Sequence, residues 1–340
     1  MDKSSATKLD APATAAPARA WSRRHWIGAT AGAAIGALAA EAASLAGTWD
    51  HERPSPLAPR LRSPRAGALP LAGGGRWQGA PRLTHIGHSC HLIEIAGQRW
   101  LTDPWFFDPA FGSLRHSLAL EVGAVGPLDG IFISHRHADH FDPTALRALS
   151  KEAAVWTPDP SLLGPLAELG FARVQLSQPW LTSASGPLQI GFAPALHDVP
   201  QHSLSLAGDA ARVLFCADTG YHQHFGEIRR RFQPTTALLP CDGTRLRWEP
   251  RSIMNADEAA RAAIELGCRQ LLQTHGDAHY SDLVAEHVLS ASDPAPLAGL
   301  RTALAALRDA TRDVAAAEPA APVPDFSPLA IGETRALFTP

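Results

Sequence analysis

The sequence predicts an α/β protein built from layers of strands and helices. Short apolar runs of strand length alternate with longer segments that have helical periodicity. Histidine and aspartate side chains follow several of the apolar runs directly, as is typical of α/β proteins whose functional residues lie at the ends of strands. With 45% hydrophobic residues among 340, the chain can bury a sizeable core.

Each element is expected from its local pattern. Strands are predicted at 83–86, 92–95, 130–134, 155–157, 188–192, 213–217, 237–239 and 270–274. Helices are predicted at 143–149, 162–169, 221–231, 256–266 and around 300–312, and an Ala/Pro-rich loop at 315–324 precedes a last strand. Asp142 is expected to cap the helix that begins at Pro143. Asp257 and Glu258 suit the first turn of the helix at 256–266, because carboxylates interact favourably with the helix dipole there.

The N-terminal part of the chain is interpreted as a targeting segment at 1–45, followed by a Pro- and Gly-rich linker at 46–80 and a single folded domain at 81–338. The run Ser22-Arg23-Arg24-His25-Trp26-Ile27 matches a twin-arginine export signal. The uncharged stretch at 27–40 is shorter than the roughly 20 residues that span a membrane, and A-x-A cleavage sites occur at 37–39 and 40–42. We expect the twin-arginine translocase as a partner and a periplasmic or periplasmic membrane-associated location. A basic, Ala-rich disordered tail is the alternative.

The strongest chemical signal is the run His135-Arg136-His137-Ala138-Asp139-His140, which follows apolar residues 131–133. Neutral imidazole and carboxylate are ligands that divalent zinc prefers. Side chains alternate along an extended segment, so His135 and His137 face the same way. Asp139 and His140, past the turn, can then face a second point nearby. The pattern predicts a metal site, with two ions favoured over one; a His-rich surface loop is the alternative.

Residues 134–140 resemble the signature of the metallo-β-lactamase superfamily. The resemblance implies an αββα sandwich, hydrolysis with one or two metal ions, and further ligands at the ends of later strands. His197, Asp218 and His275 follow apolar runs in the expected order, and His279 is a second candidate for the last place. The resemblance assigns one ion to His135, His137 and His197, and the other to Asp139, His140 and His275. It makes Asp218 the bridging ligand, and Asp139 and Asp218 the catalytic carboxylates.

Two further segments narrow the resemblance. Residues 84–95 and 100–104 are similar to the opening hairpin of ascorbate-6-phosphate lactonase and N-acylphosphatidylethanolamine-hydrolysing phospholipase D, and residues 217–221 are closer to the phospholipase branch. A histidine that contacts substrate in that branch is replaced here by Ile253-Met254-Asn255. A lipid substrate stays an alternative, because an aromatic cluster is a candidate apolar rim for an acyl chain: Trp105, Phe106, Phe107 and Phe111.

The expected function is hydrolysis of a phosphodiester or a lactone or ester bond by water activated at two divalent ions. Such ions can bring the pKa of a bound water to about 7. Zinc is the ion that the ligands favour, with iron or manganese as alternatives. The net charge of −3 argues against a nucleic-acid partner, so we expect a small-molecule or lipid substrate. The alternative functions are an N-acylphosphatidylethanolamine-type phospholipase D and a non-catalytic metal-binding or sensory module.

The remaining polar candidates have weaker patterns. Asp103 is expected to accept a hydrogen bond from a ligand rather than to bind metal itself. His88, His202 and His222 are candidates for the pocket wall, with a hydrogen-bonded histidine as the favoured alternative for each. The four cysteines are interpreted as buried free thiols, although Cys216 would share the face of Asp218 if the strand continued through both.

Overall fold

The computed structural model describes residues 60–61, 78–108, 112–114, 118–208, 210–246, 251–276, 278–280, 290–314 and 323–339. The chain divides into two compact units, 1–57 and 58–340, and every described residue belongs to the second. The predicted export signal therefore lies outside the described residues. A two-residue strand in the predicted linker, Arg60–Leu61 (β1), pairs with Phe107–Asp108 (β5).

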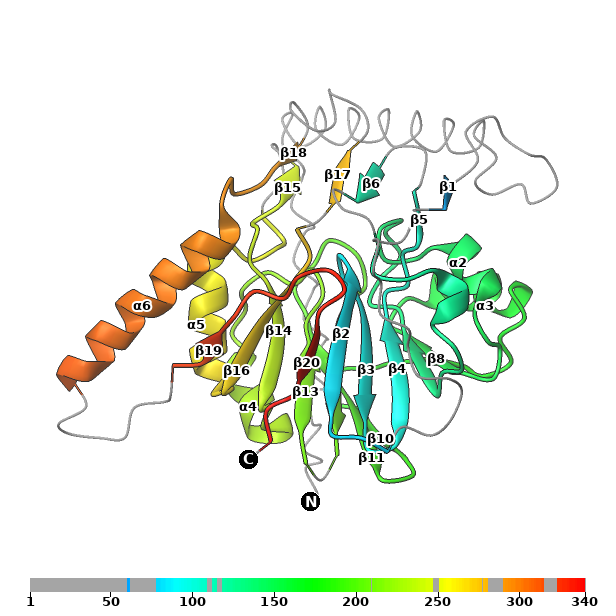
Figure 1. Cartoon of the computed structure of the whole chain (residues 1–340), viewed down its shortest axis with the longest axis horizontal. Helices are drawn as coiled ribbons and strands as arrows, with labels where there is room; N and C mark the ends of the chain where they lie inside the picture. The colour runs from blue at the N-terminus through cyan, green and yellow to red at the C-terminus, as the bar shows by residue number, and fades with distance from the viewer. Residues whose placement is uncertain are drawn as a thin grey trace, which may run out of the picture. The chain divides into compact units, whose positions relative to one another are not determined.

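Two sheets of seven strands form the centre of this unit (Figure 1). The strands of the first sheet are Arg82–Gly87 (β2), Cys90–Ile95 (β3), Gln98–Thr102 (β4), Gly130–Phe132 (β7), Ala154–Thr157 (β8), Val174–Leu176 (β9) and Thr334–Ala336 (β20), in the order β20-β2-β3-β4-β7-β8-β9. Those of the second are Thr182–Ser185 (β10), Leu188–Pro194 (β11), His202–Ala207 (β12), Arg212–Phe215 (β13), Thr236–Pro240 (β14), Gln270–Thr274 (β16) and Asp325–Phe326 (β19), in the order β10-β11-β12-β13-β14-β16-β19.

Shorter elements complete the unit. Two more strand pairs are Gly112–Leu114 (β6) with Ala278–Tyr280 (β17), and Arg245–Leu246 (β15) with Ser290–Ala291 (β18). The helices are Pro143–Ala148 (α2), Leu163–Glu168 (α3), Phe225–Phe232 (α4), Ala256–Leu266 (α5) and Pro296–Val314 (α6), with 3-10 turns at Val122–Ala124 and Pro160–Leu162. Among the described residues no helix is both long enough and apolar enough to cross a membrane.

Three buried clusters show how the layers pack. The middle cluster fills the space between the two sheets and contains Phe132 from one sheet with Phe192 and Phe215 from the other. A second cluster joins the outer face of the first sheet to α2 and α3, and a third joins the outer face of the second sheet to α4, α5 and α6. These layers form the αββα sandwich that the resemblance implied.

The site is positioned by parallel strands in both sheets. β4, β7 and β8 are parallel neighbours in the first sheet, and β13, β14 and β16 are parallel neighbours in the second. Because parallel strands end at the same edge of a sheet, the residues after them meet there. The segments that follow β4, β7, β13, β14 and β16 carry most of the polar side chains described below.

The helix ends follow their local chemistry. Asp142 caps α2 by accepting hydrogen bonds from the backbone N–H groups of Thr144 and Ala145, as predicted. α5 spans the predicted residues 256–266, begins with a capping box between Asn255 and Glu258, and ends at Gly267 with a left-handed φ of 66°.

Two predictions were wrong. The helix predicted at 221–231 begins only at Phe225, because a turn precedes it in which His222 Nδ1 accepts a hydrogen bond from the His224 N–H. The aromatic rim is also wrong for Trp105 and Phe106, which are 1% and 0% exposed and belong to the core beneath the first sheet. Phe107 packs against the same core, and Phe111 lies outside the described residues.

Candidate metal centre

The first motif forms a tight loop after β7. The backbone N–H groups of His140 and Phe141 both donate to the carbonyl oxygen of His137, at 3.0 and 2.8 Å. This turn reverses the chain after His137, so Asp139 and His140 face a different point from the one that His135 and His137 face. The local sequence therefore produces two ligand directions from one short segment, as predicted from its spacing.

One group of potential ligands consists of His135, His137 and His197. His135 Nε2 lies 3.0 Å from His137 Nδ1, which lies 3.3 Å from His197 Nε2. Two nitrogens bound to one tetrahedral zinc at about 2.0–2.1 Å are themselves about 3.3 Å apart. The spacing of these three imidazoles therefore fits one ion.

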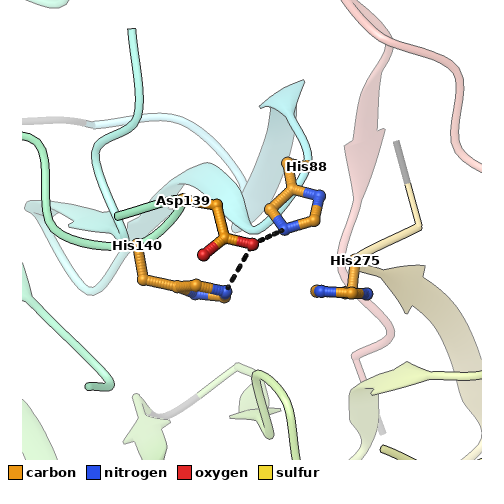
Figure 2. A group of neighbouring side chains, drawn as sticks. All are labelled: His88, Asp139, His140 and His275. Atoms are coloured by element: carbon orange, nitrogen blue, oxygen red, sulfur yellow. Dashed lines mark ion pairs between the residues drawn. The ribbon is translucent and has the colours of Figure 1, made fainter. Parts of the chain in front are cut away.

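A second group consists of His88, Asp139, His140 and His275, whose ligand atoms all lie within 4.8 Å of one another. Figure 2 shows the four side chains pointing toward a common centre. Asp139 Oδ2 lies 3.8 Å from His140 Nε2 and 3.4 Å from His88 Nε2. Three of these residues were predicted as ligands, whereas His88 was considered only as a possible part of the pocket wall.

Asp218 connects the two groups. Its Oδ2 lies 3.2 Å from His140 Nε2, 3.3 Å from His275 Nε2 and 3.8 Å from His135 Nε2. A carboxylate in this position can bind two ions at once. The structure thus brings together all seven residues that the sequence offered as ligands, from four separate segments of the chain.

Hydrogen bonds on the far side of three imidazoles orient them. Asp103 Oδ2 accepts from His140 Nδ1 at 2.7 Å, as expected for Asp103, and Asp242 Oδ1 lies 3.0 Å from His275 Nδ1. His135 Nδ1 lies 2.9 Å from the hydroxyl of Ser134, which in turn donates to Asp103. A proton held on each Nδ1 leaves Nε2 with its lone pair directed at the cluster, which is the arrangement found around protein-bound metals.

Asp242 was not predicted from the sequence. It stands two residues after β14, in Leu239-Pro240-Cys241-Asp242, so the same strand-end rule that selected Asp218 would have found it. Gln201 and Asp198 were also missed. The amide of Gln201 lies 3.0 Å from His135 Nδ1, and Asp198 Oδ1 lies 3.1 Å from His197 Nε2.

The electrostatics favour ionised carboxylates among the ligands. Burial works to raise the pKa of Asp218, but His140 and His275 outweigh it and hold that pKa well below its usual range. Burial acts in the same direction on Asp139, where His140 and His88 outweigh it and lower the pKa. Both carboxylates are therefore charged at neutral pH, as metal ligands must be.

The imidazoles differ in their pKa shifts. Burial, aided by His140, holds the pKa of His135 well below its usual value, and burial and His275 lower the pKa of His88 to about 4. Burial also works to lower the pKa of His275, but Asp218 and Asp242 raise it to about 9. His88 and His135 are thus neutral at pH 7, whereas His275 carries a proton that an incoming cation would displace.

Several residues at the site have left-handed backbone conformations that residues other than glycine rarely adopt. The φ angles are 52° at His88, 36° at Asp103, 48° at Ala217 and 65° at His275. Each such conformation costs on the order of 1–3 kcal/mol and persists only where the surrounding structure enforces it. These conformations lower the stability of the fold and fix the directions of the side chains, which is characteristic of functional sites.

Other candidates from the sequence lie elsewhere. His202 Nδ1 forms a hydrogen bond of 2.8 Å with the Ser177 hydroxyl. His202 is in none of the ligand groups found among the described residues. β13 ends at Phe215 and the chain turns at Ala217, so Cys216 packs into the outer core instead of sharing the face of Asp218. All four cysteines are buried thiols, as predicted.

Two further histidines, His222 and His279, were candidates for the site. The His222 ring stacks on Phe225 at 4.3 Å between centroids and is in none of the ligand groups found in the described part of the chain. His279 lies in β17, but its side chain is outside the described ones, so the choice between it and His275 rests on the position of His275 in the second group.

The donor set fits divalent cations. Within the described part of the chain, the buried atoms His140 Nε2 and Asp218 Oδ1 have no hydrogen-bond partner, and an unsatisfied buried polar atom is costly. A cation between the groups would satisfy both. The cluster also has an accessible side, because the side chains of His137 and Asp139 are 38% and 32% exposed while His88, His135 and His140 are fully buried.

A family described as the β-lactamase superfamily domain matches residues 98–276, which contain every residue of the ligand groups except His88. The chain therefore belongs to the β-lactamase superfamily, and its fold and site define a metal-dependent hydrolase of the metallo-β-lactamase kind. The resemblance first seen in residues 134–140 is confirmed.

Individual relatives match parts of the chain. It is 38% identical over 99 residues to a putative Rieske 2Fe-2S iron-sulfur protein of Mycobacterium tuberculosis, covering 27% of this chain and 19% of that protein. It is 29% identical over 218 residues to the mitochondrial N-acyl-phosphatidylethanolamine-hydrolyzing phospholipase D of Saccharomyces cerevisiae, covering 56% and 46%. The chain thus spans less than half the length of each of these two relatives.

The fold is also seen in solved structures. The isothiocyanate hydrolase from Delia radicum gut bacteria superposes with a TM-score of 0.58 at 18% identity, covering 76% of this chain and 100% of that one. At this identity the likeness shows the fold alone. It agrees with the αββα arrangement of the two central sheets.

Proposed function

We propose that this protein hydrolyses a phosphodiester or a lactone or ester bond with water activated at two zinc ions. The observation that carries the proposal is the pair of ligand groups joined by Asp218, whose carboxylate is 3.2–3.8 Å from imidazoles of both. Zinc is proposed because imidazole nitrogen and carboxylate oxygen make up the whole donor set. His135, His137 and His197 would hold one ion, and Asp139, His140 and His275 the other.

Two ions bound here would lower the pKa of a water to about 7 and so supply a nucleophile at neutral pH. Residues of the chain orient the imidazoles and the carboxylate that would hold the ions. Asp103 and Asp242 keep a proton on Nδ1 of His140 and His275, and Asp218 stays ionised between the groups. Substrate would approach from the side of His137 and Asp139, the half-exposed members of the cluster.

A cleft beside His275 favours an anionic substrate. It has a volume of about 400 Å³ and is lined by Asp242, His275, Gly276 and the first residues of α6, including Arg301. An arginine pairs well with a phosphate or carboxylate group of a substrate. We propose that this cleft holds a charged group next to the bond that is cleaved, which favours phosphodiesters over neutral esters.

A phospholipase activity is the second candidate, because the yeast relative carries that activity in its name and aligns with 56% of this chain. Two observations weigh against a long acyl chain. Trp105 and Phe106 are buried in the core and present no apolar rim, and Ile253 and Met254 stand where a substrate-contacting histidine was expected. A lost polar contact costs about 1–3 kcal/mol of binding.

The test is hydrolysis of bis-(p-nitrophenyl) phosphate by purified protein, with metal content measured by elemental analysis on the same sample. We expect about two ions per chain and turnover that a chelator abolishes and added zinc restores. Lactones and N-acylphosphatidylethanolamine are assayed in parallel, and efficient release of phosphatidic acid would put the phospholipase first. Two bound ions without turnover on any of these substrates would instead favour the non-catalytic metal-binding or sensory module.

We also propose that the protein is exported folded through the twin-arginine translocase to the periplasm or its membrane surface. The support is the Arg23-Arg24 pair with its apolar stretch. Because metal binding and folding are coupled, export after folding would let the protein take up its metal in the cytoplasm.

A further inference from the structure

His88 belongs to the second ligand group but lies outside the part of the chain that the superfamily match covers. It stands in the turn between β2 and β3, while the other members of its group follow β7 and β16. Figure 2 shows its ring directed at the same centre as Asp139, His140 and His275. Its presence there was not implied by the motif or by the resemblance.

The turn is fixed so that the ring has little freedom. The carbonyl of His88 lies 3.1 Å from His85 Nε2, and the carbonyl of Ser89 accepts from the Thr102 hydroxyl at 2.7 Å. The Thr274 hydroxyl, one residue before His275, donates to the Ser89 hydroxyl at 3.2 Å and ties the turn to the end of β16. His88 itself has a φ of 52°, a conformation that the surrounding contacts must enforce.

The distances distinguish two roles for the ring. His88 Nε2 lies 3.4 Å from Asp139 Oδ2, beyond the usual 2.7–3.2 Å of an N–H to oxygen hydrogen bond. The same separation is close to the roughly 3.3 Å expected between neighbouring ligand atoms that each lie about 2.0–2.1 Å from one zinc ion. It also matches the 3.2 and 3.3 Å that separate Asp218 from His140 and His275.

Burial excludes a direct role in binding substrate. The His88 side chain is 0% exposed, whereas Asp139 in the same group is 32% exposed. Trp105 covers one side of the ring, edge-on at 5.2 Å between centroids, and His275 lies 4.2 Å away on another. A ring enclosed in this way, with its Nε2 directed at the group, can reach an ion held there but not a substrate outside.

We propose that His88 is a further ligand of the ion held by Asp139, His140 and His275, an inference that rests on the proposed metal-dependent function. The second ion then has five protein ligands with Asp218, against four for the first: His135, His137, His197 and Asp218. The two ions are therefore unequal. The second is bound more tightly than the first, which has one protein ligand fewer.

The test compares His88→Gln with His91→Gln in the full chain. The glutamine amide reaches about as far as Nε2 and can donate a hydrogen bond to Asp139, but it is a poor metal ligand. His91 is the matched control because it is another fully buried imidazole in the same hairpin and is in none of the ligand groups among the described residues. We expect His88→Gln to bind one ion at least about tenfold more weakly than the wild type, and His91→Gln to match the wild type.

Cadmium-loaded protein with nitrogen-labelled histidine gives a second readout that needs no variant. Scalar coupling between the cadmium nucleus and a ring nitrogen counts the histidine ligands directly. We expect six coupled rings in the wild type, those of His88, His135, His137, His140, His197 and His275. This count decides the proposal even if both variants fail to fold.

Two results would overturn the inference and leave the proposed function intact: wild-type affinity for both ions in His88→Gln, or five coupled rings with the His88 ring uncoupled. Either would make His88 a residue that only positions Asp139. Wild-type protein that binds less than one ion would instead remove the metal-dependent function itself, so the two failures are distinguishable.

Discussion

Replacing Asp218 by alanine removes a carboxylate that contacts both ligand groups. Its Oδ2 lies 3.2 Å from His140 Nε2, 3.3 Å from His275 Nε2 and 3.8 Å from His135 Nε2, and the side chain is 4% exposed. Two cations that lose a shared anion between them also repel each other more strongly. The effect should therefore fall on both ions rather than on one.

A lower bound on the loss of metal affinity follows from the effect of removing a hydrogen-bond partner of a metal ligand. Removing an outer hydrogen-bond partner of a metal ligand costs about 10–100-fold in metal affinity. A ligand shared by two ions must cost more, so we expect Asp218→Ala to lose more than about 100-fold, or about 2.7 kcal/mol. His202→Ala is the control, because its ring bonds to Ser177 at 2.8 Å and is in no ligand group of the described residues. That variant should lose only about 1 kcal/mol of folding stability.

The assay is a zinc titration against a chelating indicator, with elemental analysis and hydrolysis of bis-(p-nitrophenyl) phosphate on the same preparations. Metal content and turnover should fall together in Asp218→Ala and stay near wild type in His202→Ala. Equal metal affinity in the two variants would refute the bridging role. Thermal unfolding of both metal-free proteins shows whether a loss of fold accounts for any difference.

Asp103→Asn should weaken zinc binding about 10–100-fold, because asparagine lacks the charge that holds the Nδ1 proton of His140. The variant should keep the fold, because asparagine tolerates the φ of 36° at this position. The same zinc titration checks this prediction, and unchanged affinity would contradict the orienting role of Asp103. Zinc affinity should rise with pH from about pH 7 to about pH 9, since the metal-free protein must release two ligand protons: that of His275, whose pKa is about 9, and that of His140, whose pKa Asp218 and Asp139 raise well above its usual value against the effect of burial. Affinity measured at three pH values tests this, and a flat profile would show that both histidines enter the titration unprotonated. Replacing Arg23 and Arg24 by lysines should retain the protein in the cytoplasm, because the receptor reads that pair, and unchanged periplasmic yield on cell fractionation would remove the export proposal.

Much of the fold could be predicted because each element has a local cause. α5 matches its predicted residues, since Asn255 with Glu258 starts it and Gly267 ends it. The eight predicted strands are all present, within a few residues at their ends. Several strands of the large sheets were missed, because their sequences lack the apolar runs on which the prediction depended, among them the central β4, the edge strands β9 and β10, and the polar-alternating β12.

The sequence by itself also determined the first ligand motif, because its spacing and the turn at His137 are local. The resemblance implied further ligands at strand ends, where Asp218 and His275 were the candidates, and parallel pairing brings those ends to one edge of a sheet. Only the tertiary structure decided which residues orient those ligands and which further imidazole lies next to them. Asp242 reaches His275 from a neighbouring strand, and the hairpin turn that carries His88 is held against β16 by side-chain hydrogen bonds. Such partners come from segments far apart in the chain, and their distances depend on how two sheets pack, which no local pattern records.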